Sequence, residues 1–364
     1  MKKIVCLFLA VLLCVGMLAG CQTGSVGETQ ATQQTTEATQ TIEEDGIVNK
    51  ILVIGHSLGI DSSYYFPFAY KAETGQDIIV GSLYHSGCRL SQHAKFLQGN
   101  EAQYAYFEID TSVDTMWKRA DCNGVFTEST PGQGNDKFIE DGSIAQTMEF
   151  AIMRQDWDLI ILQAGSFEAA GAQIANNLLD VKNIQIIADY VLEKDIVPGT
   201  KPQFAWNMVW THPEDDTMLT DSRKNTLYQN FSGSAEMYEK MMDTAENVIM
   251  PSFDFDYLLP SGTTVQNANS SYLEAKDLYR DTIHGSDFTR MMAGYTWYCA
   301  IYGADISQCN FLTIPGKIRC EKVYREANID FTMTQEQKDI LVESVTNALA
   351  TPYAMTQSQY TTAP

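Results

Sequence analysis

The chain has few basic side chains for its length. Its 364 residues include 24 Lys and Arg against 46 Asp and Glu, which gives a formal charge of −22. This excess of acid disfavours nucleic acid and anionic membrane surfaces as partners, because both repel negative charge. It favours a substrate that is neutral or positively charged.

The sequence also lacks the cysteine spacing of a metal site. None of its eight cysteines forms a C-x-x-C pair, so a structural zinc is not expected. His85 and His93 have no acidic partners at ligand spacing. We therefore predict no metal and no cofactor. Five cysteines follow Cys21, and an odd number predicts a free thiol or an intermolecular bond; their pairing stays open.

The apolar run at the N-terminus is too short to span a membrane. It extends from Ile4 to Ala19, follows Lys2 and Lys3, and falls short of the roughly 20 residues that a span needs. These features predict a secretory signal over residues 1–20. The end of the run, Leu-Ala-Gly-Cys, resembles a bacterial lipobox, which implies lipidation of Cys21 and a membrane anchor at the bacterial cell surface.

The segment after the signal contains no aromatic residue and no leucine. Residues 21–46 consist mainly of Thr, Gln, Glu, Gly and Ala, and cannot bury enough apolar surface to fold, so we expect a flexible tether. The folded domain is expected over 47–305, with an insertion around 98–140. A C-terminal extension at 306–350 is expected to pack on the domain, and a tail covers 351–364.

Strand and helix patterns alternate through the domain. Helices are predicted near 64–74, 142–154, 172–194, 222–246 and 286–302, with a last one from Thr334, and a hairpin is predicted within the insertion. Short apolar runs predict five strands: Lys50–Ile54, Asp77–Leu83, Trp157–Leu162, Gln203–Met208 and Asn247–Pro251. This alternation predicts an α/β fold, a three-layer α/β/α sandwich with a five-stranded parallel sheet.

Three polar segments follow three of these strands. They are 55–57, 85–87 and 163–166. The carboxyl ends of parallel strands meet at one edge of a sheet, where ligands bind. We therefore expect one shared site at this edge.

Two short motifs supply a nucleophile and its base. Gly-His-Ser-Leu-Gly places Ser57 on a turn after the first strand, and Asp-Thr-Ile-His places Asp281 three residues before His284. Serine needs a base to take its proton, and the base needs an acid to orient it. The first motif also fits the elbow of α/β-hydrolases, but that elbow lies deep in the domain and its acid and base lie well apart.

This arrangement resembles the SGNH (GDSL-like) hydrolases, which carry the serine after strand one and D-x-x-H near the C-terminal end. The resemblance implies a flavodoxin-like fold and a triad of Ser57, Asp281 and His284. It further implies an oxyanion hole from the backbone N–H groups of Ser57 and Gly87 and an asparagine after strand three. This chain has Gln163 at that third position.

With glutamine in place of this asparagine, the chain resembles a poorly characterised bacterial branch of that superfamily. His93 and Ser166 match motifs of that branch. We assign substrate-binding roles to His56, His93, Ser166 and Trp206. Core packing of Trp206 is an equal alternative, and His56 is a rival for the base.

We expect an exported, lipid-anchored serine esterase acting on small acyl esters, preferably acetyl groups on carbohydrates. Two alternatives stay open: a glycan-binding lipoprotein that has lost catalysis, and an O-acyltransferase. A lipase is disfavoured because the sequence has no long apolar lid segment.

Overall fold

The computed structural model describes residues 48–131, 135–171, 179–194, 198–216, 219, 231–311, 318–319, 328–329 and 333–363. The predicted signal, the tether, Cys21 and Cys320 lie outside these residues, as does most of the predicted turn at 131–134. Within the described ranges no helix has the length and apolar character that a bilayer span requires.

A mixed sheet of eight strands forms the centre of the domain, in the order β5-β4-β3-β2-β1-β6-β7-β8. The five strands β2, β1, β6, β7 and β8 pair in parallel, and β3, β4 and β5 extend the β2 edge antiparallel. The predicted parallel core is therefore present, but the prediction that the sheet has only five strands is wrong. The strands are β1 (Lys50–Gly55), β2 (Ile79–Tyr84), β3 (Ala105–Asp110), β4 (Lys118–Ala120), β5 (Phe126–Glu128), β6 (Leu159–Leu162), β7 (Gln203–Asn207) and β8 (Tyr257–Leu259), with β9 (Ile318–Arg319) and β10 (Asn328–Ile329) pairing separately.

The extension of the sheet comes from the predicted insertion. Tyr106 and Phe107 point to opposite faces of β3 and both are fully buried, so β3 is an interior strand between β2 and β4. The insertion also contains a hairpin, which is formed by β4 and β5. The insertion thus continues the sheet beyond the edge of its parallel part.

The fifth predicted strand, Asn247–Pro251, is wrong. The chain there forms a π-helical turn, η1 (Ala245–Ile249), and a 3-10 turn, η2 (Met250–Ser252). Ala245 and Ile249 are buried while all three residues between them, 246–248, are exposed; a strand would bury Asn247 on the same face, so the spacing is that of a helix. The fifth parallel strand is β8, which follows shortly after.

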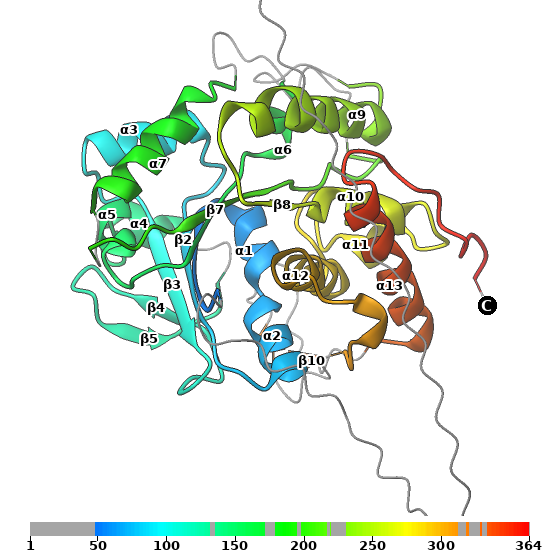
Figure 1. Cartoon of the computed structure of the whole chain (residues 1–364), viewed down its shortest axis with the longest axis horizontal. Helices are drawn as coiled ribbons and strands as arrows, with labels where there is room; N and C mark the ends of the chain where they lie inside the picture. The colour runs from blue at the N-terminus through cyan, green and yellow to red at the C-terminus, as the bar shows by residue number, and fades with distance from the viewer. Residues whose placement is uncertain are drawn as a thin grey trace, which may run out of the picture. The chain divides into compact units, whose positions relative to one another are not determined.

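Helices cover both faces of the sheet. Figure 1 shows α3 and α7 together on one side of the strands and α1 and α12 on the other, where α12 also packs on α2, α10 and α13. The predicted start of the last helix at Thr334 is confirmed: Thr334 is the N-cap of α13 and forms a capping box with Gln337. The helices are α1 (Ser57–Ser63), α2 (Phe66–Thr74), α3 (Leu90–Gln98), α4 (Asp136–Glu140), α5 (Met148–Ile152), α6 (Ser166–Ala169), α7 (Lys182–Lys194), α9 (Ser234–Thr244), α10 (Ser261–Asn269), α11 (Ala275–Leu278), α12 (Asp287–Tyr302) and α13 (Gln335–Ala350), with the 3-10 turn η3 (Ile306–Gln308).

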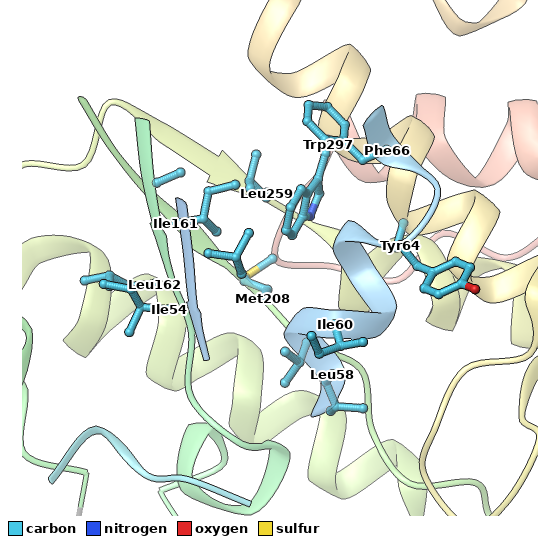
Figure 2. Close-up of a cluster of buried hydrophobic side chains, with 14 of the residues drawn as sticks. Ile54, Leu58, Ile60, Tyr64, Phe66, Ile161, Leu162, Met208, Leu259 and Trp297 are labelled. Atoms are coloured by element: carbon cyan, nitrogen blue, oxygen red, sulfur yellow. The ribbon is translucent and has the colours of Figure 1, made fainter. Parts of the chain in front are cut away.

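The core beneath α1 fixes this helix on the sheet. Figure 2 shows Leu58 and Ile60 of α1 in one cluster with Ile54, Ile161 and Trp297, and all five side chains are buried. Burying an aliphatic side chain of this size contributes about 2 kcal/mol. The first residue of α1 is Ser57, so this packing holds the candidate nucleophile at the carboxyl end of β1.

The C-terminal residues pack alongside α10. The backbone N–H of Tyr272 donates to the Tyr360 carbonyl at 2.7 Å, and the N–H of Thr356 donates to Oδ1 of Asn267 at 2.7 Å. Residues of the predicted tail therefore take part in the packing around α10.

Candidate active site

Ser57 begins helix α1 directly after the strand that carries it. β1 ends at Gly55, and His56 is the N-cap, with its Nδ1 accepting the Leu58 N–H at 3.3 Å. Ser57 is half-buried. The N–H groups of the first helical turn have no partner within the helix itself. Ser57 therefore lies at the carboxyl edge of the sheet, and its backbone N–H has no partner within helix α1.

The predicted acid and base form a hydrogen-bonded pair in the loop between α11 and α12. Oδ1 of Asp281 accepts the backbone N–H groups of Ile283 and His284 at 2.9 and 2.8 Å. Nδ1 of His284 lies 2.9 Å from Oδ1 and 2.8 Å from Oδ2 of the same carboxylate. Burial raises the pKa of Asp281, but the His284 ring and these N–H groups outweigh it and hold that pKa below its usual range. An ionised Asp281 accepts a proton-bearing Nδ1, which leaves Nε2 of His284 as the base.

The same loop is attached to the helix of Ser57. Asp61 lies one helical turn after Ser57, and its Oδ2 accepts the N–H of Gly285, the residue after His284, at 2.9 Å. From the other side, Nε1 of Trp210 donates to the Ile283 carbonyl at 2.8 Å. The structure thus brings the D-x-x-H loop and the serine helix together.

The predicted oxyanion glycine lies in the turn after β2. Gly87 is exposed and has a φ of +58°, a left-handed conformation that a side chain rarely adopts. The turn is closed by the Cys88 N–H donating to the His85 carbonyl at 3.2 Å. Behind it, the buried carboxyl of Glu168 accepts the Leu90 N–H at 3.2 and 3.3 Å. Glu168 therefore supports the start of α3 directly after this turn.

Glu168 makes the stability of the protein depend on pH. Burial raises its pKa from an ordinary 4.5 to about 7. Between these values the unfolded chain has released the proton while the folded protein still holds it, so stability falls as pH rises through this window. Glu168→Gln removes this loss of stability and keeps an oxygen that can accept the Leu90 N–H. Urea unfolding is expected to show the variant gaining about 3 kcal/mol over wild type between pH 4 and pH 8.

The exposed Glu128 of β5 offers a matched control for this measurement. Glu128→Gln should leave the pH dependence of unfolding unchanged, because an exposed carboxyl loses little solvation on folding. If the stability of Glu168→Gln follows wild type in parallel from pH 4 to pH 8, Glu168 does not titrate in this window.

Gln163 lies at the end of β6 and is buried under the serine helix. Its Oε1 accepts Nδ2 of Asn207 at 3.0 Å, and its Nε2 has no hydrogen-bond partner among the described residues. A Cβ atom added to Gly55 or Gly59 would stand 2.6 or 2.9 Å from this Nε2. The amide therefore packs against the glycines on either side of Ser57, and its oxyanion role stays a prediction.

The four predicted substrate-binding residues are all buried. Nδ1 of His93 is 2.9 Å from the Tyr104 hydroxyl, the hydroxyl of Ser166 donates to the Trp210 carbonyl at 2.7 Å, and the Trp206 ring contacts Phe255. His56 is also buried, and Nε2 of each of His56 and His93 has no hydrogen-bond partner in the described part of the chain. Burial lowers the pKa of His56 to about 4. In this structure these side chains serve internal contacts.

Three charged residues at the site have no motif that predicts them. The buried Asp61 and Arg290 form an ionic cluster with the partly exposed Arg280, between α1, the D-x-x-H loop and α12. The only signal in the sequence is spacing, since Asp61 follows Ser57 by one helical turn and Arg280 directly precedes Asp281. That signal places a carboxylate near the nucleophile without revealing its partners.

Comparisons with known proteins show the family to which the chain is related. The model of a domain of unknown function, DUF4886, matches residues 137–331. No functionally curated protein matches the sequence. The crystal structure of a DUF4886 family protein from Bacteroides uniformis superposes with a TM-score of 0.59 at 19% identity, covering 85% of this chain and 97% of that one. This likeness supports the fold.

Two further solved structures are more distant. A protein from Slackia heliotrinireducens that has been proposed to be an SGNH hydrolase has a TM-score of 0.40 at 13% identity, covering 70% of this chain and 100% of its own. A gut microbial diltiazem-metabolizing enzyme has a TM-score of 0.35 at 12% identity, covering 72% of this chain and 49% of its own. These scores are too low to support an argument about function.

Proposed function

We propose that this chain, which belongs to the DUF4886 family, is a serine esterase that hydrolyses small acyl esters through an acyl-enzyme. One observation carries the proposal: the bonded Asp281–His284 pair is docked on the helix that begins with Ser57. A serine, a histidine and a carboxylate form the unit that activates a hydroxyl for acyl transfer, and the approach of His284 to Ser57 is part of the proposal.

The reaction follows from the roles of these atoms. Nε2 of His284 takes the proton of Ser57 as Oγ attacks the ester carbonyl, and Asp281 stabilises the imidazolium that forms. The alcohol leaves with that proton, and water activated by His284 then releases the acid and frees Ser57. The N–H groups of Ser57 and Gly87 are proposed to stabilise the oxyanion, with Nε2 of Gln163 as the third donor.

The substrate and location are proposed from other features. The strong negative charge favours a neutral ester over an anionic one. The N-terminal sequence favours export and a lipid anchor at Cys21, where the protein meets surface polysaccharides. We therefore propose acetyl groups on carbohydrates as the preferred substrate.

The test uses the full-length chain with p-nitrophenyl acetate, butyrate and octanoate, and with acetylated oligosaccharides. We expect hydrolysis that is fastest for acetate, and a fluorophosphonate probe attached to Ser57 in wild type and absent in Ser57→Ala. An acylated sugar acceptor as the main product would instead identify a transferase. Tight oligosaccharide binding without ester turnover or labelling would contradict the esterase and favour a binding protein.

A further inference from the structure

Asp61 is a completely buried carboxylate at the junction of three segments. Its Oδ1 and Oδ2 each lie 2.9 Å from Nη1 of Arg280, and Oδ1 lies 2.9 Å from both Nε and Nη2 of Arg290. Its Oδ2 also accepts the N–H of Gly285. One side chain of α1 therefore contacts the D-x-x-H loop at two points and α12 at one.

Stability alone is a poor explanation for this cluster. Burial would raise the pKa of Asp61, but the guanidinium groups of Arg280 and Arg290 outweigh it and keep that pKa lowered, so the carboxylate is ionised. Buried ions lose their hydration, and apolar residues of similar size often stabilise a fold as well or better. Arginine–carboxylate contacts supply a fixed direction, which apolar packing does not.

These directional contacts of Asp61 orient the loop that holds the proposed base, His284. Arg280 directly precedes Asp281, Gly285 directly follows His284, and the Arg280 N–H donates to the His284 carbonyl at 2.9 Å. Nη1 of Arg280 also contacts the Gly285 carbonyl. Both ends of the loop 280–285 are thus attached to Asp61, four residues from Ser57.

We propose that Asp61 and Arg280 are positioning residues that lock the loop 280–285 onto helix α1 and so set the approach of His284 to Ser57. The catalytic consequence rests on the function proposed above; the locking itself does not. Arg290 has the separate task of joining α12 to α1, since its guanidinium stacks 4.4 Å from the Tyr64 ring and lies 3.6 Å from Asp287.

Arg280 is the informative position for a test. Its side chain is 30% exposed, and its removal leaves Asp61 bonded to Arg290 and the Gly285 N–H. Arg280→Gln therefore removes one of the two attachments of the loop to Asp61, which weakens the lock without leaving a bare buried charge. Arg154 offers a matched control, because its side chain is 34% exposed and pairs with Glu108 at 2.9 Å on β3, outside the active site.

The experiment compares full-length wild type, Arg280→Gln, Arg280→Lys and Arg154→Gln. Amide hydrogen exchange is expected to rise about tenfold at Gly285 in Arg280→Gln and to stay unchanged there in Arg154→Gln. With p-nitrophenyl acetate, kcat of Arg280→Gln should fall about 10²-fold while KM stays within about twofold of wild type, because binding is kept and alignment is lost. Arg280→Lys restores the charge and should recover part of kcat.

The two readouts separate the lock from the proposed function. Exchange at Gly285 that rises no more in Arg280→Gln than in Arg154→Gln overturns the lock. A kcat within twofold of wild type despite faster exchange overturns its positioning role. If wild type neither turns over esters nor reacts with a fluorophosphonate, the proposed function fails, and the exchange at Gly285 still decides whether the loop is locked.

Discussion

Replacing His284 by alanine is expected to lower kcat for acetyl ester hydrolysis by about 10⁴- to 10⁶-fold, as much as Ser57→Ala. Without the ring, Oγ of Ser57 has no base to take its proton during attack, and a neutral serine is nearly inert at pH 7. The two residues act as one unit, so the double variant should be no slower than either single variant. Steady-state rates with p-nitrophenyl acetate, corrected for spontaneous hydrolysis, measure all three.

His56 provides the sharpest control, because it is the other histidine beside Ser57. Burial lowers its pKa to about 4, and its Nδ1 already accepts the Leu58 N–H, so it is a weak base held by the helix cap. Asparagine is a good N-cap, so His56→Asn keeps this contact and should retain activity within about tenfold. If His56→Asn is inactive while His284→Ala is active, the base is His56 and the proposed triad is wrong.

The parallel core of the fold could be predicted because its central strands are apolar on both faces. Ile51–Ile54 of β1 and the whole of β6 are continuous buried runs bounded by polar residues, a pattern typical of parallel sheets. β8 escaped prediction because it has only three residues, too few to show a period. The neighbouring run at 247–251 is apolar enough to predict a strand, but residues 246–248 are all exposed between the buried Ala245 and Ile249, so the chain there packs as a helical turn.

The pairing of Asp281 with His284 could be predicted because both lie within one short motif. The cluster that docks them could not, because Asp61 and Arg280 are 219 residues apart and meet only in the folded chain. A sequence pattern reports local spacing, whereas an ionic contact between helix and loop depends on how the sheet orders its strands. The same reason leaves the third oxyanion donor open, since Gln163 follows β6 as expected but its amide packs against Gly55 and Gly59.

Asp281→Asn is expected to lower kcat about 10⁴-fold while leaving the loop folded. Oδ1 of Asp281 accepts the N–H groups of Ile283 and His284, and the asparagine oxygen can keep both bonds. The amide NH₂ then takes the place of Oδ2, which lies 2.8 Å from Nδ1 of His284. A donor at this position requires an unprotonated Nδ1, so the proton moves to Nε2 and the ring can no longer act as a base toward Ser57.

A matched control separates this tautomer effect from the loss of a charge on an acidic protein. Asp305 accepts the Ser307 N–H at 2.9 Å in a turn of the same kind, at the start of η3, and Asp305→Asn should keep wild-type kcat. ¹⁵N chemical shifts of the His284 ring report its tautomer directly, with Nδ1 protonated in wild type and Nε2 protonated in Asp281→Asn. If the tautomer changes and kcat does not, His284 is not the base, whereas an unchanged tautomer with a 10⁴-fold loss assigns Asp281 an electrostatic role toward the imidazolium instead.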